Sequence, residues 1–538
     1  MDTLLEALRA HFGFEQFRPL QREIIAELME GHSVVGILPT GAGKSVCYQL
    51  PALLLPGVTI VISPLISLMK DQTDGLVARG IPALAINSHD TPEEGWAKLS
   101  ALARGEARIL FVAPERLQNA AFLEACAKTR ISLLAVDEAH CVSQWGHDFR
   151  PEYRQIPAFH EAVGRPPMLA LTATARPTVQ HDLMHELGIP DAQLFRSSSD
   201  RPNLWFGVEP CLSEAERRGK LTYLLKAQPG SAIVYVTSRR AAETLAASLT
   251  FELGEPVGCY HAGMVPEART AVQNQFMTDL LRVVVATSAF GMGIDKPDIR
   301  TVLHAGIPES LEAYYQEIGR AGRDGQPARC VMVLIPGRDV KAREFLVKQS
   351  ADPHGWERFR RICSYVFRSN GCRRTFLLRY LGETVSPQSE ACCSFCHPLV
   401  LPDIIPVAVA RKPRRRRGEG EQAAAPLSAQ PLGSGQDSAA AALFDHLRLW
   451  RRRKAQEMEV PAFIVFGDRD LTGIAAAAPA TLAALAACRG IGPTKLRLYG
   501  AELLAEIARY QHVASSMAVL SRSSGLGNSS RCATLGSM

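Results

Sequence analysis

Two adjacent carboxylates, Asp137 and Glu138, follow an apolar run at residues 131–136. Such an aliphatic run is typical of a buried strand, so both side chains would stand at a strand end. One carboxylate placed there can hold the shell of a Mg²⁺ ion, and its neighbour can orient or deprotonate an attacking water. We assign the first role to Asp137 and the second to Glu138. A solvated acidic turn is the alternative, and it fits the apolar run poorly.

A glycine-rich segment at residues 38–52 reads "LPTGAGKSVCYQLPA". Glycines there let backbone N–H groups approach phosphate oxygens, Lys44 can reach the β- and γ-phosphates, and the hydroxyl of Ser45 can ligate Mg²⁺. The usual spacing has a glycine where this chain has Leu38. The carboxylate pair compensates for that departure, and together the two features predict a nucleoside triphosphatase. The predicted phosphate loop comprises Thr40, Gly41, Ala42, Gly43, Lys44 and Ser45.

Residues 314–325, "YYQEIGRAGRDG", form a segment that we call the arginine segment. Its Gln316, Arg320 and Arg323 are four and then three residues apart, which predicts that they share one face of a helix. Planar guanidinium groups suit phosphate charge. If two domains close on a nucleotide, arginines from across the cleft would act on it, an effect worth roughly 10³–10⁵ in rate. A basic surface helix is the alternative for this segment taken alone.

Short apolar runs must position these groups, and they fall into two series. Most contain β-branched residues and end in polar or Gly/Pro-rich turns, with helix-compatible segments between them, which indicates buried parallel strands of α/β domains. We predict two tandem parallel-sheet domains, residues 1–197 and 198–338, that meet near "SSSDRPN" (197–203). The runs are residues 33–38, 58–63, 107–113, 131–136 and 168–173, and then 231–237, 256–262, 282–288, 301–306 and 330–336.

The composition sets limits on the class of protein. The chain has 538 residues, 47% hydrophobic and 21% charged, which is ordinary for a globular protein of roughly three or four domains. Its net charge of +6 permits a polyanionic partner without requiring one. We find no signal-peptide pattern and no apolar run of about 18 residues, so we expect no membrane span and a cytoplasmic location. In a reducing compartment, clustered cysteines indicate a metal rather than disulfides.

Nine segments in one order along the chain closely resemble the RecQ family of DNA helicases, in helicase superfamily 2. The match covers about residues 1–398 and 440–510. It implies two RecA-like domains and an ATP-driven motor that moves 3′→5′ on single-stranded DNA and unwinds forked DNA in repair and recombination. It also implies single-strand-binding or repair proteins as partners and a place at the bacterial nucleoid. The segments are "FGFEQFRPLQ" (12–21), "LPTGAGKSVCYQLPA" (38–52), "ISPLISLMKDQ" (62–72), "FVAPERL" (111–117), "DEAHCVSQWGHDFRPEY" (137–153), "LALTATA" (169–175), "YHAGM" (260–264), "ATSAFGMGIDKPDIR" (286–300) and "QEIGRAGRDG" (316–325).

The resemblance also implies roles for residues near the phosphate loop and the carboxylates. Phe14 would stack on adenine, while Arg18 and Gln21 would read it. The stretch Ser143–Tyr153, which we call the coupling loop, would sense DNA and signal to the ATP site, since a base stacked on an aromatic ring contributes roughly 1–3 kcal/mol. A hydrophobic plug with polar neighbours is the alternative. The residues assigned to DNA coupling are Gln144, Trp145, His147, Phe149 and Arg150.

A helical subdomain, residues 339–400, is predicted to bind zinc. Its first ligand stands in "GCRRTFLLRYLGE", which matches the start of the RecQ zinc subdomain, and three more stand in "EACCSFCHP". The spacing in "CSFC" suits two thiolate ligands. The family usually separates the two cysteines that are adjacent here, so Cys363 or His397 stays open as a replacement for one of them, and free buried thiols are the other alternative. The assigned ligands are Cys372, Cys392, Cys393 and Cys396.

The remaining chain changes character three times. Residues 401–438 begin with a basic run and are then rich in Ala, Pro, Gly and Ser, so we expect a linker, too short and too polar to fold as the winged-helix domain that many RecQ proteins carry there. Residues 439–510 regain helical spacing and resemble the HRDC module, and the tail at 511–538 reads as disordered. The module's basic stripe either binds DNA or forms a solvated face. It comprises Arg448, Arg451, Arg452, Arg453 and Lys454.

Two other functions stay open at this point. An RNA helicase of the same superfamily would share the ATP site, although the coupling loop and the cysteine cluster argue against it. A DNA-annealing or scaffold protein could bind ATP without productive turnover, although Lys44, Asp137, Glu138 and Arg323 are intact. The expected ligands for the leading function are ATP, Mg²⁺ and Zn²⁺.

Overall fold

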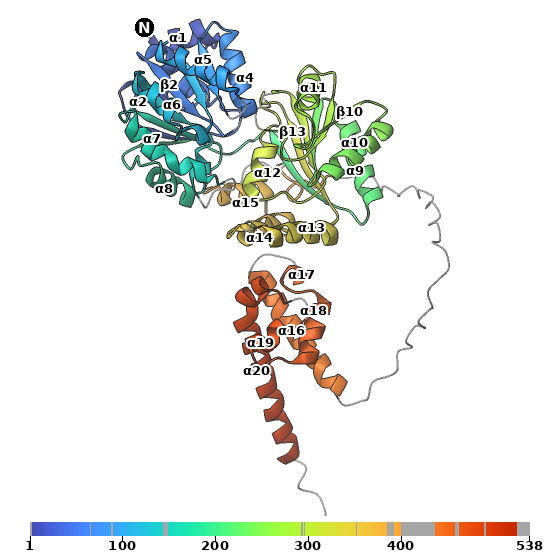
Figure 1. The fold of residues 1–538 in the computed structure, drawn as a ribbon. Coiled ribbons are helices and arrows are strands. Elements are labelled where there is room, and N and C mark those ends of the chain that lie inside the picture. The colour runs from blue at the N-terminus through green and yellow to red at the C-terminus, as the bar shows by residue number, and fades with distance from the viewer. Residues whose placement is uncertain are drawn as a thin grey trace, which may run out of the picture. The chain divides into compact units, whose positions relative to one another are not determined.

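The chain forms two compact units, Met1–Ala408 and Val409–Met538 (Figure 1). The fold is that of a computed structural model. It describes residues 3–64, 66–87, 90–143, 149–291, 294, 296–350, 352–384, 392–399, 436–457, 462–488 and 491–523.

A seven-stranded parallel sheet forms the first domain of the first unit, in the order β3-β4-β2-β5-β6-β1-β7. All five apolar runs predicted here are strands. The two additional strands, β3 and β7, lie at the edges of the sheet; β3 is partly buried in its middle, and β7 exposes its first two residues. The strands are β1 (Val34–Ile37), β2 (Val58–Ile62), β3 (Ala83–Ile86), β4 (Ile109–Val112), β5 (Ile131–Val136), β6 (Met168–Thr172) and β7 (Gln193–Arg196).

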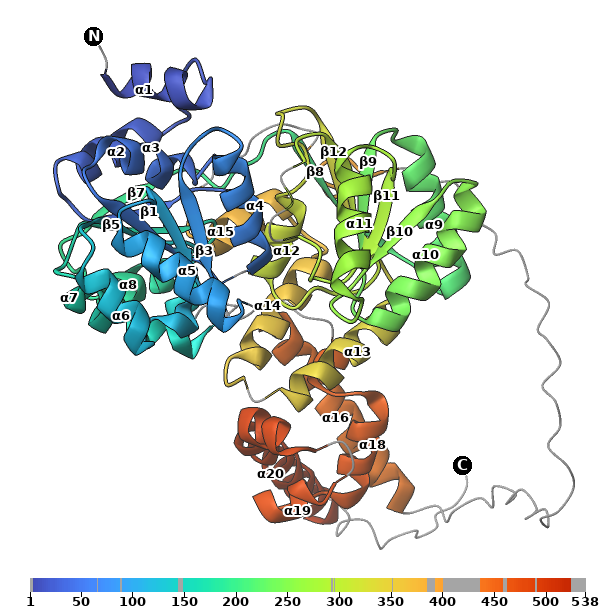
Figure 2. The same ribbon diagram turned by 45° about the horizontal axis from the view of Figure 1, so that its top comes forward.

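Helices cover both faces of this sheet, as Figure 2 shows. Alternate residues of β5 enter different apolar layers: Leu134 and Val136 pack into one, and Leu133 and Ala135 into the other. Burial on both faces explains why the central strands read as continuous apolar runs. The helices are α1 (Thr3–Phe12), α2 (Gln21–Met29), α3 (Val46–Leu54), α4 (Ile66–Val77), α5 (Pro92–Ala103), α6 (Ala120–Ala127), α7 (Ile156–Ala162) and α8 (Pro177–Glu186), with short 3₁₀ turns at Pro114–Arg116, Ala139–Val142 and Pro151–Gln155.

A second parallel sheet, of six strands, follows in the order β10-β11-β9-β12-β13-β8. Its five predicted runs are strands, and the additional strand β8 lies at an edge, paired with β13. The strands are β8 (Leu204–Pro210), β9 (Ser231–Tyr235), β10 (Val257–Tyr260), β11 (Val283–Ala286), β12 (Ile299–His304) and β13 (Ala328–Leu334), and the helices are α9 (Glu214–Ala227), α10 (Arg239–Leu253), α11 (Pro266–Met277) and α12 (Leu311–Ile318).

Three helices complete the first unit: α13 (Pro336–Gln349), α14 (Gly355–Val366) and α15 (Arg373–Tyr380). Residues 392–399 follow and pair with the edge strand β8, because the N–H of Phe206 donates to Cys392 O at 3.2 Å and the N–H of Ser394 donates to Phe206 O at 2.8 Å. The cysteine segment is therefore attached to the second sheet.

The second unit is helical, with α16 (Gln436–Glu457), α17 (Ala462–Val465), α18 (Asp468–Ala477), α19 (Leu482–Ala486) and α20 (Pro493–Ser523). Its core includes the aromatic cluster of Trp450, Phe466 and Tyr499. The predicted fold class, two parallel-sheet α/β domains, a cysteine-bearing helical subdomain and a helical module, is confirmed.

Disorder of the tail, residues 511–538, stays a prediction, and the structure describes the backbone of the tail as far as Ser523. Helix α20 continues to Ser523, since no glycine or proline interrupts the chain before Gly525. None of the helices in the described parts of the chain is both long enough and apolar enough to cross a bilayer.

Candidate ATP site, coupling loop and zinc site

The phosphate loop connects the end of β1 to the start of α3, so the positive end of α3 points at it. Gly41 and Gly43 have left-handed φ angles of 86° and 74°. A Cβ on Gly43 would lie 2.7 Å from Nε2 of Gln21. Only glycine meets both demands, and the resulting turn is one that can wrap a phosphate group.

Two residues that the resemblance assigns to adenine hold this loop. Gln21 donates from Nε2 to the carbonyls of Ala42 (3.1 Å) and Gly43 (2.9 Å), and its Oε1 accepts the N–H of Arg18. The guanidinium of Arg18 donates to the carbonyl of Gly41. Leu20, directly before Gln21, has a left-handed φ of 66°, a rare state for a bulky residue that turns the chain into α2. Contact of these side chains with adenine stays a prediction.

Phe14 presents an aromatic face near the start of the chain. Its side chain is 47% exposed, and its ring stacks on Phe12 with the centroids 6.5 Å apart. An exposed ring that is held in place by a second ring is suited to stack on a base. Its role with adenine also stays a prediction.

The carboxylate pair lies directly after β5, as predicted. Asp137 accepts the N–H of Glu138 on Oδ1 at 3.0 Å, and Glu138 has a left-handed backbone (φ 46°, ψ 45°), which costs roughly 1–3 kcal/mol for such a residue. Burial and then the nearby Glu138 raise the pKa of Asp137 to about 6, while Lys44 lowers it. A divalent cation would favour the charged forms of both carboxylates, so this donor set fits Mg²⁺.

A buried histidine connects the carboxylates to the segment "LALTATA". His140 Nδ1 lies 2.9 Å from Thr172 Oγ1 and 3.3 Å from Glu138 Oε2. Burial alone would lower the pKa of His140, but Cys141 and Glu138 raise it above its ordinary value. Thr172 of β6 thus holds His140, and His140 in turn orients the side chain of Glu138. The sequence did not reveal the contact between His140 and Thr172, because these two residues are far apart in the chain.

The described ends of the coupling loop are attached to the ATP site. The hydroxyl of Tyr153 donates to Asp137 O at 3.0 Å. Arg150 donates from its backbone N–H to Cys141 O and from Nη1 to Pro64 O, both at 2.9 Å. Phe149 lies under the guanidinium of Arg154, 5.2 Å from the ring centroid. The other three predicted coupling residues, Gln144, Trp145 and His147, lie outside the described residues.

The expectation that the arginine segment forms one helical face is wrong. Helix α12 ends at Ile318, and Gly319 and Gly322, the latter with φ 54°, turn the chain away from the helix. Gln316 lies on α12, whereas Arg320 and Arg323 follow it and point to different places. The buried Arg320 donates a hydrogen bond to Gly291 O. Arg323 approaches Gly41 so closely that a Cβ added to Gly41 would lie 3.2 Å from Cγ of Arg323.

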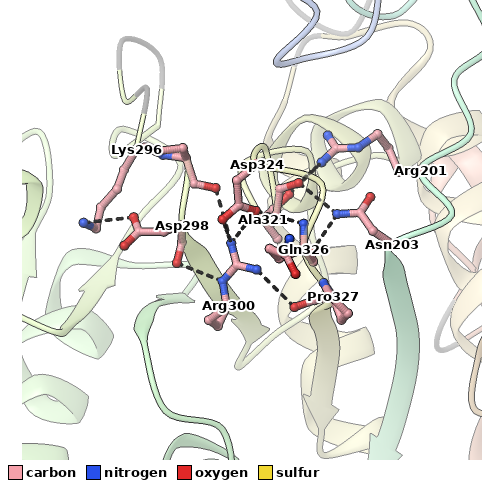
Figure 3. A network of polar contacts seen from close by, with 11 residues as sticks. Arg201, Asn203, Lys296, Asp298, Arg300, Ala321, Asp324, Gln326 and Pro327 are labelled. Carbon is pink, nitrogen blue, oxygen red and sulfur yellow. Dashed lines mark hydrogen bonds and ion pairs between the residues drawn. The ribbon is translucent and has the colours of Figure 1, made fainter.

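A network of polar contacts fixes the arginine segment within the second domain (Figure 3). Arg300 donates to both carboxylate oxygens of Asp324 at 2.7 Å and to the carbonyls of Asp298 and Pro327. Lys296 pairs with Asp298 at 3.0 Å. The segment "ATSAFGMGIDKPDIR" is thereby attached to the end of the arginine segment.

The four assigned cysteines come together. Their sulfur atoms lie 3.3–3.8 Å apart in four of the six pairs, close to the roughly 3.8 Å expected around a tetrahedral zinc with bonds of about 2.3 Å. The adjacent Cys392 and Cys393 need no left-handed backbone. Among the described residues, neither Cys363 nor His397 joins this group of sulfur atoms. The donor set fits Zn²⁺.

The basic stripe of the helical module is largely neutralised within the module. Arg451 is buried and donates a hydrogen bond to Phe466 O at 2.9 Å, so it does not belong to an exposed stripe. Only Arg448 and Arg452 of the five keep an exposed charge without an ion pair among the described residues. The pairs are Arg451–Asp468 (2.6 Å), Arg453–Glu506 (3.0 Å) and Lys454–Glu502 (2.8 Å).

Solved helicase structures share the fold of the first unit. Mss116p, bound to ssRNA and AMP-PNP, matches 71% of this chain and 90% of its own with a TM-score of 0.55 and 17% identity. Mycobacterium smegmatis Lhr, bound to ssDNA and AMP-PNP, matches 65% of this chain and 49% of its own with a TM-score of 0.51 and 22% identity. At these identities the likeness concerns the fold alone.

Four family descriptions match successive parts of the chain. They are DEAD/DEAH box helicase (residues 18–182), helicase conserved C-terminal domain (216–325), RecQ zinc-binding (337–397) and HRDC domain (440–507).

Curated relatives agree with these matches. The ATP-dependent DNA helicase RecQ of Haemophilus influenzae is 41% identical over 71% of this chain and 61% of its own length, and that of Bacillus subtilis is 42% identical over 73% and 66%. The chain thus spans about two thirds of these relatives. The probable ATP-dependent DNA helicase RecS of Bacillus subtilis is 40% identical over 65% of this chain and 70% of its own length. By these matches, the chain belongs to the RecQ family of DNA helicases.

Proposed function

We propose that this chain is an ATP-dependent DNA helicase that moves 3′→5′ on single-stranded DNA and unwinds forked DNA. The observation that carries the proposal is the approach of Arg323, from the second domain, to Gly41 of the phosphate loop. Lys44 of the same loop is close enough to Asp137 to lower its pKa. A triphosphate between the domains would therefore meet cations from both sides and a carboxylate pair.

Each residue of this site has a distinct task in hydrolysis. Lys44 binds the β- and γ-phosphate oxygens, and Arg323 stabilises the charge that develops on the transferred phosphoryl group. Glu138, oriented by His140, positions the attacking water and accepts its proton. Ser45 and Asp137 would hold Mg²⁺, and that ion would neutralise negative charge on the phosphate oxygens.

The coupling loop connects DNA to this chemistry. A base stacked on its aromatic side chains would order the loop, and the hydrogen bond from Tyr153 to Asp137 O passes that order to the carboxylates. The direction of movement and the preference for forked DNA rest on the family resemblance. One zinc ion per chain, single-strand-binding or repair proteins as partners, and action at the bacterial nucleoid are parts of the same proposal.

Two measurements test the proposed function. The first is steady-state ATP hydrolysis without nucleic acid, with single-stranded DNA, and with single-stranded RNA. We expect strong stimulation by DNA only; stimulation by RNA alone would indicate an RNA helicase, and binding without turnover would indicate an annealing or scaffold protein. The second is strand separation of a fork compared with 3′-tailed and 5′-tailed duplexes, where unwinding of the 5′-tailed duplex would contradict the direction.

A further inference from the structure

The stretch between the two sheet domains, residues 197–203, holds a half-buried arginine that contacts both domains. We call this stretch the interdomain linker. Arg201 donates only to backbone carbonyls, and among the described residues none of its hydrogen bonds goes to a carboxylate. The acceptors are Thr40 O (3.3 Å), Gly319 O (3.5 Å), Ala321 O (2.9 Å) and Gly322 O (2.7 Å).

These carbonyls lie where the two halves of the ATP site meet. Thr40 belongs to the phosphate loop, and a Cβ on Gly319 would lie 3.1 Å from Cβ of Thr40, so the two segments are in close approach. Gly319 caps the end of α12, where carbonyls lack helical partners, and Ala321 and Gly322 lie in the turn that follows; the planar fork of an arginine can satisfy several such carbonyls at once. Arg201 thus holds the backbone on both sides of Arg320 and directly before Arg323.

A neighbouring side chain of the linker supports the same backbone. Asn203 donates from Nδ2 to Gly322 O at 2.8 Å and to Gln326 O at 2.9 Å, and Figure 3 shows Arg201 and Asn203 converging on the arginine segment. The contacts of Asn203 stay on the side of the second sheet. Those of Arg201 also reach Thr40 O, so of these two linker residues Arg201 is the one that contacts both halves.

The zinc-binding subdomain holds the linker in turn. Arg374 of α15 is buried, pairs with Asp200 at 2.7 Å and donates to three linker or β8 carbonyls. It stands two residues after the zinc ligand Cys372, and the intervening residue donates its backbone N–H to the sulfur of Cys393 at 3.4 Å. The carbonyls are Arg201 O (3.0 Å), Pro202 O (3.3 Å) and Leu204 O (2.5 Å).

We propose that Arg201 is a positioning residue that sets the register of the arginine segment against the phosphate loop, and that Arg374 holds Arg201 in place from the zinc-binding subdomain. The proposal rests on the proposed ATP hydrolysis. When Arg201 is lost, Arg323 keeps its charge but no longer meets the phosphate loop in a fixed geometry. Hydrolysis then slows, whereas nucleotide binding by the phosphate loop persists.

The test compares kcat and KM for ATP, at saturating single-stranded DNA, with the affinity for AMP-PNP. We expect Arg201→Gln to lower kcat at least ~10-fold, with KM and AMP-PNP affinity changed less than ~3-fold. Arg201→Lys keeps the positive charge but lacks the planar guanidinium, so it should also lower kcat while KM and AMP-PNP affinity change little. If Arg201→Gln does not fold, the result for Arg201→Lys tests the proposal. The matched control is Arg343→Lys, because Arg343 is a half-buried arginine that also donates to a backbone carbonyl, that of Ile307.

A double variant tests the link to the zinc-binding subdomain. Arg374→Lys should lower kcat on its own but add no further loss to Arg201→Gln, since both act through one contact. Unchanged kcat in folded Arg201→Gln, or an equal loss of AMP-PNP affinity, would overturn the proposal, and additive losses would overturn the role of Arg374. Failure of the proposed function is distinguishable, because it would appear as absent DNA-stimulated hydrolysis in the unsubstituted chain.

Discussion

The hydroxyl of Tyr153 donates a hydrogen bond to the backbone carbonyl of Asp137 at 3.0 Å, and both residues are buried. Tyr153 closes the coupling loop, and Asp137 immediately precedes Glu138. One hydrogen bond therefore joins the far end of the loop that we propose senses DNA to the backbone of the carboxylate pair. The two residues are sixteen positions apart, so local sequence does not impose this contact.

Removal of that hydroxyl should weaken both stability and coupling. We expect Tyr153→Phe to lower the free energy of unfolding by about 1–3 kcal/mol, because the carbonyl of Asp137 loses its buried partner. Stimulation of ATP hydrolysis by single-stranded DNA should fall several-fold while the rate without DNA changes little. Urea denaturation and ATPase assays measure the two effects. Tyr365→Phe is the control, since it loses a buried hydroxyl contact with Tyr314 and no contact with the carboxylates.

Trp145→Ala tests the loop at its proposed base-stacking position. Phosphate contacts along both sheet domains should preserve most of the DNA affinity, and the ATP site is left intact. The ratio of the ATPase rates with and without saturating single-stranded DNA should collapse, and unwinding with it. A ratio equal to that of the unsubstituted chain would mean that the loop is a structural plug.

Substitutions in the ATP site should separate binding from chemistry. Lys44→Ala removes the main cation at the γ-phosphate, so turnover should fall by at least ~10². Glu138→Gln keeps the shape of the side chain but cannot accept a proton, so AMP-PNP should still bind while hydrolysis is lost. Normal turnover in either variant, measured with saturating DNA, would refute the assignment of this site.

The cysteine cluster predicts about one zinc per chain, measurable by elemental analysis after purification without chelators. Cys372→Ser should lose the metal and fold poorly, because structural zinc contributes roughly 10–16 kcal/mol of binding-linked folding energy in small zinc domains. Cys363→Ser is the matched control: that thiol is also buried but lies outside the cluster, so zinc content should not change. A well-folded, metal-free protein would contradict the zinc assignment.

The apolar pattern of the sequence predicts most of the strands. All ten apolar runs identified in the sequence are strands. Nine of them lie inside the sheets, where burial on both faces favours apolar residues along the whole strand, whereas β10 lies at an edge and is buried at alternate residues. The three strands that pattern did not reveal, β3, β7 and β8, are all edge strands. Strand β7 begins and ends with a polar residue and β8 contains Glu209, so their apolar pattern is weaker. Strand β3 is apolar throughout, and the sequence analysis did not identify it.

The hypotheses about the chemistry of the site rest on residue types and short spacings. The carboxylate pair after an apolar run, the glycines before Lys44 and the three cysteines at 392–396 lie close together in the chain, so their spacing is informative, whereas Cys372 lies twenty residues before Cys392. The tertiary structure alone decided where Arg320 and Arg323 point, and it alone brought Arg201 to Thr40 and Tyr153 to Asp137. These contacts depend on how two sheets and a helical subdomain pack together, and such packing is a property of the whole fold that no single segment encodes.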